Sequence, residues 1–142
     1  MGIKRLTAEQ APALAHLHAG SMEKSWDEKS FVNFLNEKTI VGIGAFDSEI
    51  LLGFFLYRVV EDEMEILTIA VDEPYRRQGI ARQLLKEGMP ENATVFLEVN
   101  EENSAAQALY LNAGFEIYGQ REKYYQTENG MKDAILMRKK PM

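Results

Sequence analysis

Residues 66–85 read ILTIAVDEPYRRQGIARQLL, and no other stretch constrains the fold as strongly. The stretch begins as an apolar, partly β-branched run typical of a strand and continues into a polar turn that contains two arginines. After Gly79 the apolar residues recur at helical spacing, which predicts a helix over about 78–86. A second β-type run follows at 94–99. Two strands joined through a helix are expected to be parallel, connected by a crossover.

The other elements follow from periodicity and from residues that cap helices. Thr7 with Gln10 resembles a capping box, Asp27 caps a second helix, and Asn103 caps a helix that ends at Gly114. A turn over residues 128–130 joins the last two strands. The expected strands are 3–6, 40–46, 50–60, 63–71, 94–99, 115–125 and 131–137.

The lengths of the connections predict the fold class. Short polar turns at 47–49 and 61–63 make the central strands an antiparallel meander, whereas the helix over 78–86 requires a parallel crossover. We therefore expect an α+β fold with a mixed sheet and a functional site near the crossover. The 142 residues show no repeat or linker, so 1–142 is expected to be one domain.

The composition excludes several classes of protein. Without cysteine there is no disulfide, thiolate metal site or cysteine nucleophile. The only two histidines, His16 and His18, stand two apart on a helix and point to different sides, so no metal is expected. No apolar run approaches the roughly 20 residues that span a bilayer, and the first ten residues lack the apolar core of a secretory signal. We expect a cytoplasmic protein that does not bind membranes.

The net charge of -6 bears on the partner. It argues against direct binding to the phosphate backbone of nucleic acids. A cationic partner and simple solubility are both compatible with it.

The turn before the central helix has the features of an anion site. Backbone N–H groups at a helix start, a glycine, and the side chains of Arg76 and Arg77 all favour a phosphate. The spacing differs from that of a P-loop or a dinucleotide fingerprint. A polar loop followed by a helix cap remains the alternative.

The frame from Arg76 to Ala81 also resembles motif A of the GNAT superfamily of N-acetyltransferases, in which Arg or Gln is followed by x-x-Gly-x-Gly or Ala. Further segments resemble the RimI branch of that superfamily: 26–31, 69–72, 97–99, 103, 108–110, 114–115, 124–125 and 133–134. The resemblance implies a mostly antiparallel seven-stranded sheet, about four helices, and a splayed parallel strand pair at the CoA site. It also implies acetyl-CoA as co-substrate.

By the same resemblance, the cofactor lies along the central strand, turn and helix. The implied cofactor-binding residues are Ile69, Ala70, Val71, Arg76, Arg77, Gln78, Gly79, Ile80, Ala81 and Asn103. A backbone N–H around Ala70 or Val71 is the expected donor to the developing oxyanion.

Two further residues are candidates for catalysis. Alternation places Glu98 on the side of its strand opposite to Leu97 and Val99, where a carboxylate must be solvated, paired or functional. Tyr110 has the helical spacing of a core residue. Resemblance makes Glu98 the general base and Tyr110 the general acid, with direct transfer because no cysteine can carry the acetyl group.

The RimI branch acetylates the N-terminal alanine of a small-subunit ribosomal protein, so the implied partner is a protein N-terminus. Trp26 and Tyr124 match positions that flank the peptide groove, although either could be a packing anchor. The segment 81–95 is shorter than usual, and Asn100 stands where the branch often has arginine, which leaves the peptide preference open. Alternatives are acetylation of a lysine or small amine, and a catalytically silent CoA-binding module.

Overall fold

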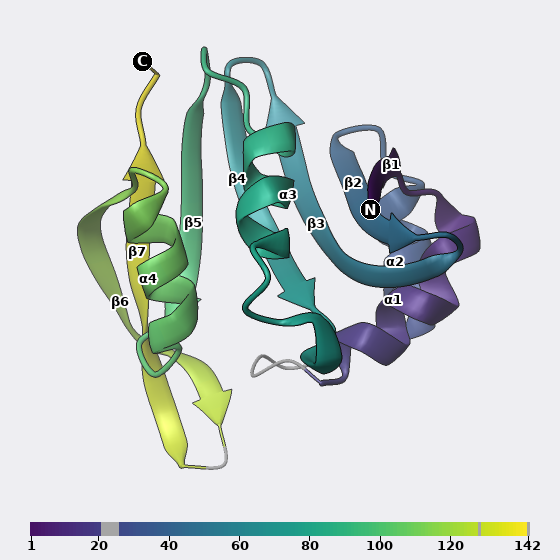
Figure 1. Cartoon of the computed structure of the whole chain (residues 1–142). Coiled ribbons are helices and arrows are strands. Elements are labelled where there is room, and N and C mark those ends of the chain that lie inside the picture. The colour runs from purple at the N-terminus through teal and green to yellow at the C-terminus, as the bar shows by residue number, and fades with distance from the viewer. Residues whose placement is uncertain (21–25, 128, 142) are drawn as a thin grey trace.

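The computed structural model describes residues 1–20, 26–127 and 129–141. Its centre is a seven-stranded sheet in the order β1-β2-β3-β4-β5-β7-β6 (Figure 1). The strands are β1 (Gly2–Arg5), β2 (Ile40–Asp47), β3 (Ile50–Val60), β4 (Glu63–Val71), β5 (Thr94–Asn100), β6 (Glu116–Thr127) and β7 (Gly130–Lys139). The helices are α1 (Ala11–His18), α2 (Glu28–Leu35), α3 (Ile80–Gly88) and α4 (Ser104–Asn112), with 3-10 turns η1 (Ala8–Gln10) and η2 (Glu73–Tyr75).

The predicted capping residues are confirmed, and the helix expected from about residue 78 begins at Ile80. The Thr7 and Gln10 capping box is present, with the Thr7 N–H donating to Gln10 Oε1 at 2.7 Å, but it opens η1, and α1 follows directly. Asp27 caps α2 by accepting from the Ser30 N–H at 2.8 Å. Asn103 caps α4 by accepting from the Ala106 N–H at 3.1 Å.

The mixed sheet is also confirmed. Strands β2 to β4 form the expected antiparallel meander, and β1 pairs antiparallel with β2. The β2–β3 and β3–β4 turns place Ser48 and Glu61 at positive φ. In the last hairpin the Thr127 hydroxyl donates to the Gly130 carbonyl at 2.9 Å, whereas Glu128 of the predicted turn lies outside the described residues.

The parallel pair is short. Strands β4 and β5 pair only through residues 63–65 and 94–96, after which β4 continues beside β3 and β5 beside β7. Figure 1 shows the two ribbons together at the start of both strands and apart further along. The sheet is therefore split next to the turn that leads to α3.

Apolar residues cover both faces of the sheet. Neighbours Phe54 and Phe55 on β3 are both fully buried, and alternation sends them to different clusters. Phe55 packs with residues of α3 and α4, whereas Phe54 packs with residues of α1 and α2. Helices thus flank the meander on both sides, and α4 lies over the β5–β7 half (Figure 1).

Among the described helices, none has the length and apolar character that crossing a membrane requires.

Candidate functional site

The turn before α3 presents free backbone donors. Arg77 and Gly79 both have positive φ, 65° and 83°, and Gly79 is the N-cap of α3 without a side-chain cap bond. A Cβ at Gly79 would meet nothing within 4 Å, so the space in front of this backbone is open. The first N–H groups of a helix have no intrahelical partner, and the helix dipole favours an anion beside them. The turn is therefore suited to bind an anion such as a phosphate group.

Two residues of the predicted cofactor set have other contacts in the structure. The Arg76 Nε donates to the Val71 carbonyl at 2.9 Å, so this side chain ties the turn to the end of β4. Ile80 is 4% exposed and packs in the core, which leaves only its backbone for a ligand. Arg77 and Gln78 are exposed, and Ala81 is half-buried.

Three of the remaining predicted cofactor residues lie along the split. Ile69, Ala70 and Val71 are half-buried near the end of β4 and pair with β3 but not with β5. Asn103 is half-buried at the start of α4, where its side-chain oxygen already caps the helix. Apart from the Val71 carbonyl, which accepts from Arg76, the strand edge facing the split is therefore available to a ligand that offers hydrogen-bonding groups.

Tyr110 lies on the α3 and α4 side of the sheet. It is 5% exposed, and its ring is 5.6 Å from that of Phe115, edge to face. Its place in the core agrees with its helical spacing.

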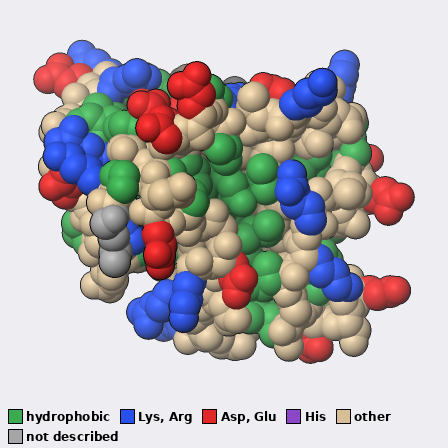
Figure 2. All heavy atoms as spheres, turned by 90° about the horizontal axis from the view of Figure 1, so that it is seen from above, with side chains coloured by type: hydrophobic (Ala, Val, Ile, Leu, Met, Phe, Trp, Pro, Cys, Tyr) green, Lys and Arg blue, Asp and Glu red, His purple; other side chains and the backbone are tan. Residues whose placement is uncertain are grey.

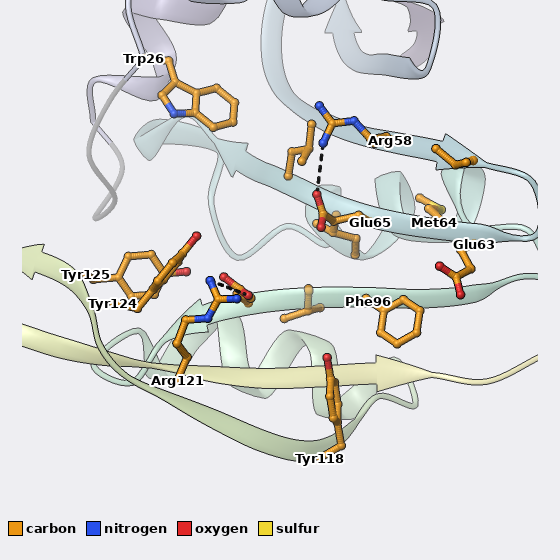
Figure 3. A pocket seen from close by; sticks show the side chains of 15 residues that line it. Trp26, Arg58, Glu63, Met64, Glu65, Phe96, Tyr118, Arg121, Tyr124 and Tyr125 are labelled. Carbon is orange, nitrogen blue, oxygen red and sulfur yellow. Dashed lines mark ion pairs between the residues drawn. The ribbon is translucent and has the colours of Figure 1, made fainter.

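A cavity of about 740 Å³ contains the other predicted residues. Trp26, Glu98 and Tyr124 all line it, with Trp26 across the cavity from Tyr124 (Figure 3). Its other lining residues are Arg58, Val60, Glu63, Met64, Glu65, Ile66, Leu67, Phe96, Leu97, Tyr118, Arg121 and Tyr125. Its size is in the range of ligand pockets, roughly 300–1,000 Å³.

Glu98 is both accessible and paired. Its side chain is 31% exposed, and its Oε1 lies 3.4 Å from the Arg121 Nη1 (Figure 3). Phe96, on the same side of β5, also lines the cavity, whereas Asn100 is 4% exposed and accepts the Glu102 N–H with its side chain. Asn100 therefore shapes the β5–α4 turn.

Trp26 is held by a buried histidine. The Trp26 N–H donates to His18 Nδ1 at 3.0 Å, and the two rings are 5.1 Å apart. His18 Nε2 is 3.3 Å from the Thr68 hydroxyl of β4. A neutral ring that accepts at Nδ1 carries its proton on Nε2 and donates it to Thr68. Burial lowers the pKa of His18, which favours this neutral form.

Sequence reasoning missed Arg121, which contacts Glu98. Alternation could not have found it, because Arg121 and Tyr124 are three apart and would face opposite sides of a regular strand. The β6–β7 register shifts between Arg121 and Tyr125, and this bulge places both side chains at the cavity.

Charge is dispersed on the face shown in Figure 2, where acidic and basic side chains surround an apolar centre and neither sign forms a continuous patch. Within residues 1–20, 26–127 and 129–141, no three His, Asp or Glu side chains are grouped to hold a metal ion. The prediction that His16 and His18 point apart is confirmed, since His18 is buried and His16 is exposed.

Comparison with known proteins places the chain in a family of enzymes. Residues 11–115 match the model of the acetyltransferase (GNAT) family, and the chain belongs to this family.

Particular relatives carry more specific names. The chain is 35% identical over 140 residues to the [ribosomal protein bS18]-alanine N-acetyltransferase of Escherichia coli strain K12, covering 95% of this chain and 94% of the relative. It is 34% identical over 145 residues to the N-alpha-acetyltransferase RimI of Mycobacterium tuberculosis, covering 96% and 90%. The crystal structure of the ribosomal-protein-S18-alanine N-acetyltransferase from Escherichia coli superposes with a TM-score of 0.91 at 33% identity, covering 99% and 94%.

Proposed function

We propose that the protein transfers the acetyl group of acetyl-CoA to the N-terminal α-amino group of a protein, specifically an alanine-initiated ribosomal protein in the cytoplasm. The observation that carries the proposal is an accessible carboxylate, Glu98, in a peptide-sized cavity beside a split sheet. Relatives named for acetylation of ribosomal alanine support the choice of substrate.

Acetyl-CoA would supply the thioester-bound acetyl group. The backbone N–H groups around Gly79, with Arg77 and Gln78, would hold its diphosphate. The free edge of β4 at Ile69 to Val71 would bind the amide-containing arm, and a backbone N–H there would stabilise the oxyanion. Arg76 has a supporting role, because its Nε holds the turn against Val71.

Glu98 and Tyr110 would move protons on the two sides of the split. Glu98, in the cavity, accepts the proton of the attacking amine, directly or through water. Tyr110, in the cluster under α3 and α4, donates from its hydroxyl to the departing sulfur. A thiol pKa near ~8.5 and a tyrosine pKa near ~10 differ little enough for this transfer.

The α-amino group is the easier substrate for a half-exposed carboxylate. With a pKa near ~7.8, about a tenth of it is neutral at pH 7, against less than about a thousandth of a lysine with a pKa near ~10.4. A base in contact with water can complete the deprotonation of the former.

The substrate test uses peptides that differ only at the first residue, with N-terminally blocked, lysine-containing copies and a small amine as comparisons. Mass spectrometry should find acetyl on the α-amino group of the alanine peptide, with kcat/KM at least tenfold above that of the blocked copies. Equal transfer to lysine or to the small amine would contradict the proposal, as would tight acetyl-CoA binding without turnover.

The catalytic assignments are tested by Glu98→Gln and Tyr110→Phe, which keep shape and remove the proton-transfer groups. Each should lower kcat on the alanine peptide by about 100-fold or more, the usual scale for general acid or base catalysis. Calorimetric acetyl-CoA affinity should stay within a few-fold. Turnover within about twofold of the parent would overturn the assignment of the residue concerned.

A further inference from the structure

We infer that Arg121 is a positioning residue for the base: it holds the Glu98 carboxylate in one orientation and leaves its second oxygen to the substrate amine. The inference rests on the proposed role of Glu98. The first observation is direct contact, since Arg121 Nη1 lies 3.4 Å from Glu98 Oε1. Both side chains line the cavity, and the dashed line at Arg121 in Figure 3 marks their ion pair.

The guanidinium is fixed by a second contact. Its Cζ lies 4.6 Å from the centre of the Tyr124 ring, within the range of a cation–π interaction. An isolated ion pair with a 53% exposed arginine would contribute little, because an exposed pair loses side-chain entropy and is screened. An arginine stacked on a ring keeps fewer conformations, so its role here is orientation more than stability.

The bulge in β6 determines this geometry. Arg121 pairs with Ala134 and Tyr125 with Lys132, so residues 122–124 lie opposite Asp133 alone. The extra length brings Arg121 and Tyr124 to the same cavity, where regular alternation would separate them.

Asp133 holds the bulge in shape. One carboxylate oxygen accepts the Lys123 N–H at 2.9 Å, and the other accepts from the Gln120 side chain. Lys123 has a φ of 51°, a left-handed conformation that a residue with a side chain keeps only when its surroundings hold it. On β7, Ala134 pairs with Arg121 of β6 on one side and with Asn100 of β5 on the other.

Arg121 and the substrate amine share one partner, the Glu98 carboxylate. The substrate amine must approach the same carboxylate that Arg121 already contacts. A base with one oxygen bound to a fixed guanidinium presents the other in a defined direction, and a displacement of about 1 Å in such a group can lower a rate on the order of 100-fold.

The test is a double-mutant cycle on the full chain, with Arg121→Met, Glu98→Gln and the double variant assayed on acetyl-CoA and the alanine peptide. Arg121→Met should lower kcat by about 10- to 100-fold and leave the KM for acetyl-CoA unchanged. In the Glu98→Gln background, Arg121→Met should cause no further loss, because its target is gone. Arg121→Lys should recover part of the loss by restoring the charge without the planar stack.

Arg138→Met is the matched control. Arg138 also bonds a carboxylate, Glu116 at 3.0 Å, and stacks on a tyrosine, Tyr118 at 4.9 Å, in the same hairpin, but it does not line the cavity. It should stay within twofold of the parent, and thermal melts should show that all variants fold.

The possible outcomes distinguish a failure of the Arg121 role from a failure of the proposed function. Parent-like turnover of Arg121→Met beside an impaired Glu98→Gln overturns the role of Arg121 and leaves the proposed function standing. Full additivity overturns it as well, because Arg121 would then act on something other than Glu98. An unimpaired Glu98→Gln overturns the assignment of Glu98 as the base and, with it, the role of Arg121, whereas the acetyl transfer itself is tested by the peptide panel.

Discussion

His18 links the fold to the cavity at the scale of one residue. It is fully buried, both ring nitrogens have partners, and one partner is the backbone of Trp26 on the cavity wall. Protonation of Nδ1 would remove the acceptor that the Trp26 N–H uses. The histidine therefore has to stay neutral for Trp26 to keep its place.

The sign of the pH effect follows from burial. Because burial lowers the pKa of His18 below about 6.5, the unfolded chain binds the proton more readily than the folded chain. The His18 contribution to the free energy of unfolding is constant above about pH 6.5 and falls as the pH drops toward the folded pKa. The free energy of unfolding, measured in urea between pH 7.5 and 5, should therefore decline less in His18→Gln than in the parent. In His16→Gln, an exposed change on the same helix, it should decline as in the parent. An identical decline in all three proteins would contradict the prediction.

At the scale of elements, the sequence predicted those features that depend on contacts between residues at most about four apart in the chain. Thr7 with Gln10, Asp27 and Asn103 each placed a helix start, because caps are short-range contacts with a defined spacing. The bulge at residues 122–124 was not predictable in this way. It depends on Asp133, and its partner is recognised only once β6 and β7 are paired.

The start of α3 gives a test at the same scale. Gly79→Ala puts a side chain at a φ of 83° and into the open space before the helix, so acetyl-CoA should bind on the order of tenfold more weakly, by calorimetry. Gly130→Ala is the matched control, because Gly130 also has positive φ, 102°, and open space, but is the first residue of β7, next to the β6–β7 turn. Both should lose about 1–2 kcal/mol of stability, and only the first should lose affinity. Equal affinities would remove the turn from the proposed cofactor site.

The Asp133 contacts offer a second test of an element. Asp133→Ala deletes both acceptors that shape the bulge, so the Arg121 guanidinium should lose its position beside Glu98. We expect a fall in kcat similar to that of Arg121→Met, with acetyl-CoA affinity unchanged. Full activity in Asp133→Ala would show that the bulge keeps its shape without the carboxylate.

At the scale of the molecule, the mixed sheet followed from the order and length of the predicted elements, since a helix between two strands requires a crossover. The split in that sheet came from resemblance alone, because residues 97–100 and 66–71 have the composition of ordinary paired strands. Which side chains would meet in the cavity depended on contacts between β5, β6 and the residues before α2, far apart in the chain.

The apolar layers on the two faces of the sheet should unfold together. Phe54→Ala and Phe55→Ala remove fully buried rings from opposite faces, and each should cost about 3–5 kcal/mol. Trp26, the only tryptophan, packs on the α1 and α2 side with Phe54. Trp26 fluorescence therefore reports on the face opposite to Phe55, and circular dichroism reports on the whole chain. If the chain unfolds in one step, Phe55→Ala should lower the urea midpoint by the same amount with both probes. Two separated transitions would mean that the layers unfold independently.

The short pairing of β4 with β5 gives this sheet inner edges as well as outer ones. Beyond residues 63–65 and 94–96, each of these strands has backbone amides without a partner on the other. Such amides exchange their hydrogens with solvent faster than paired ones. An acyl carrier with amide groups of its own would hydrogen-bond to these backbone groups. Its binding should therefore slow the hydrogen exchange of the backbone amides at the end of β4. The opening in the sheet is in this sense a missing strand, and the cofactor arm that we propose for it has the hydrogen-bonding groups to take that place.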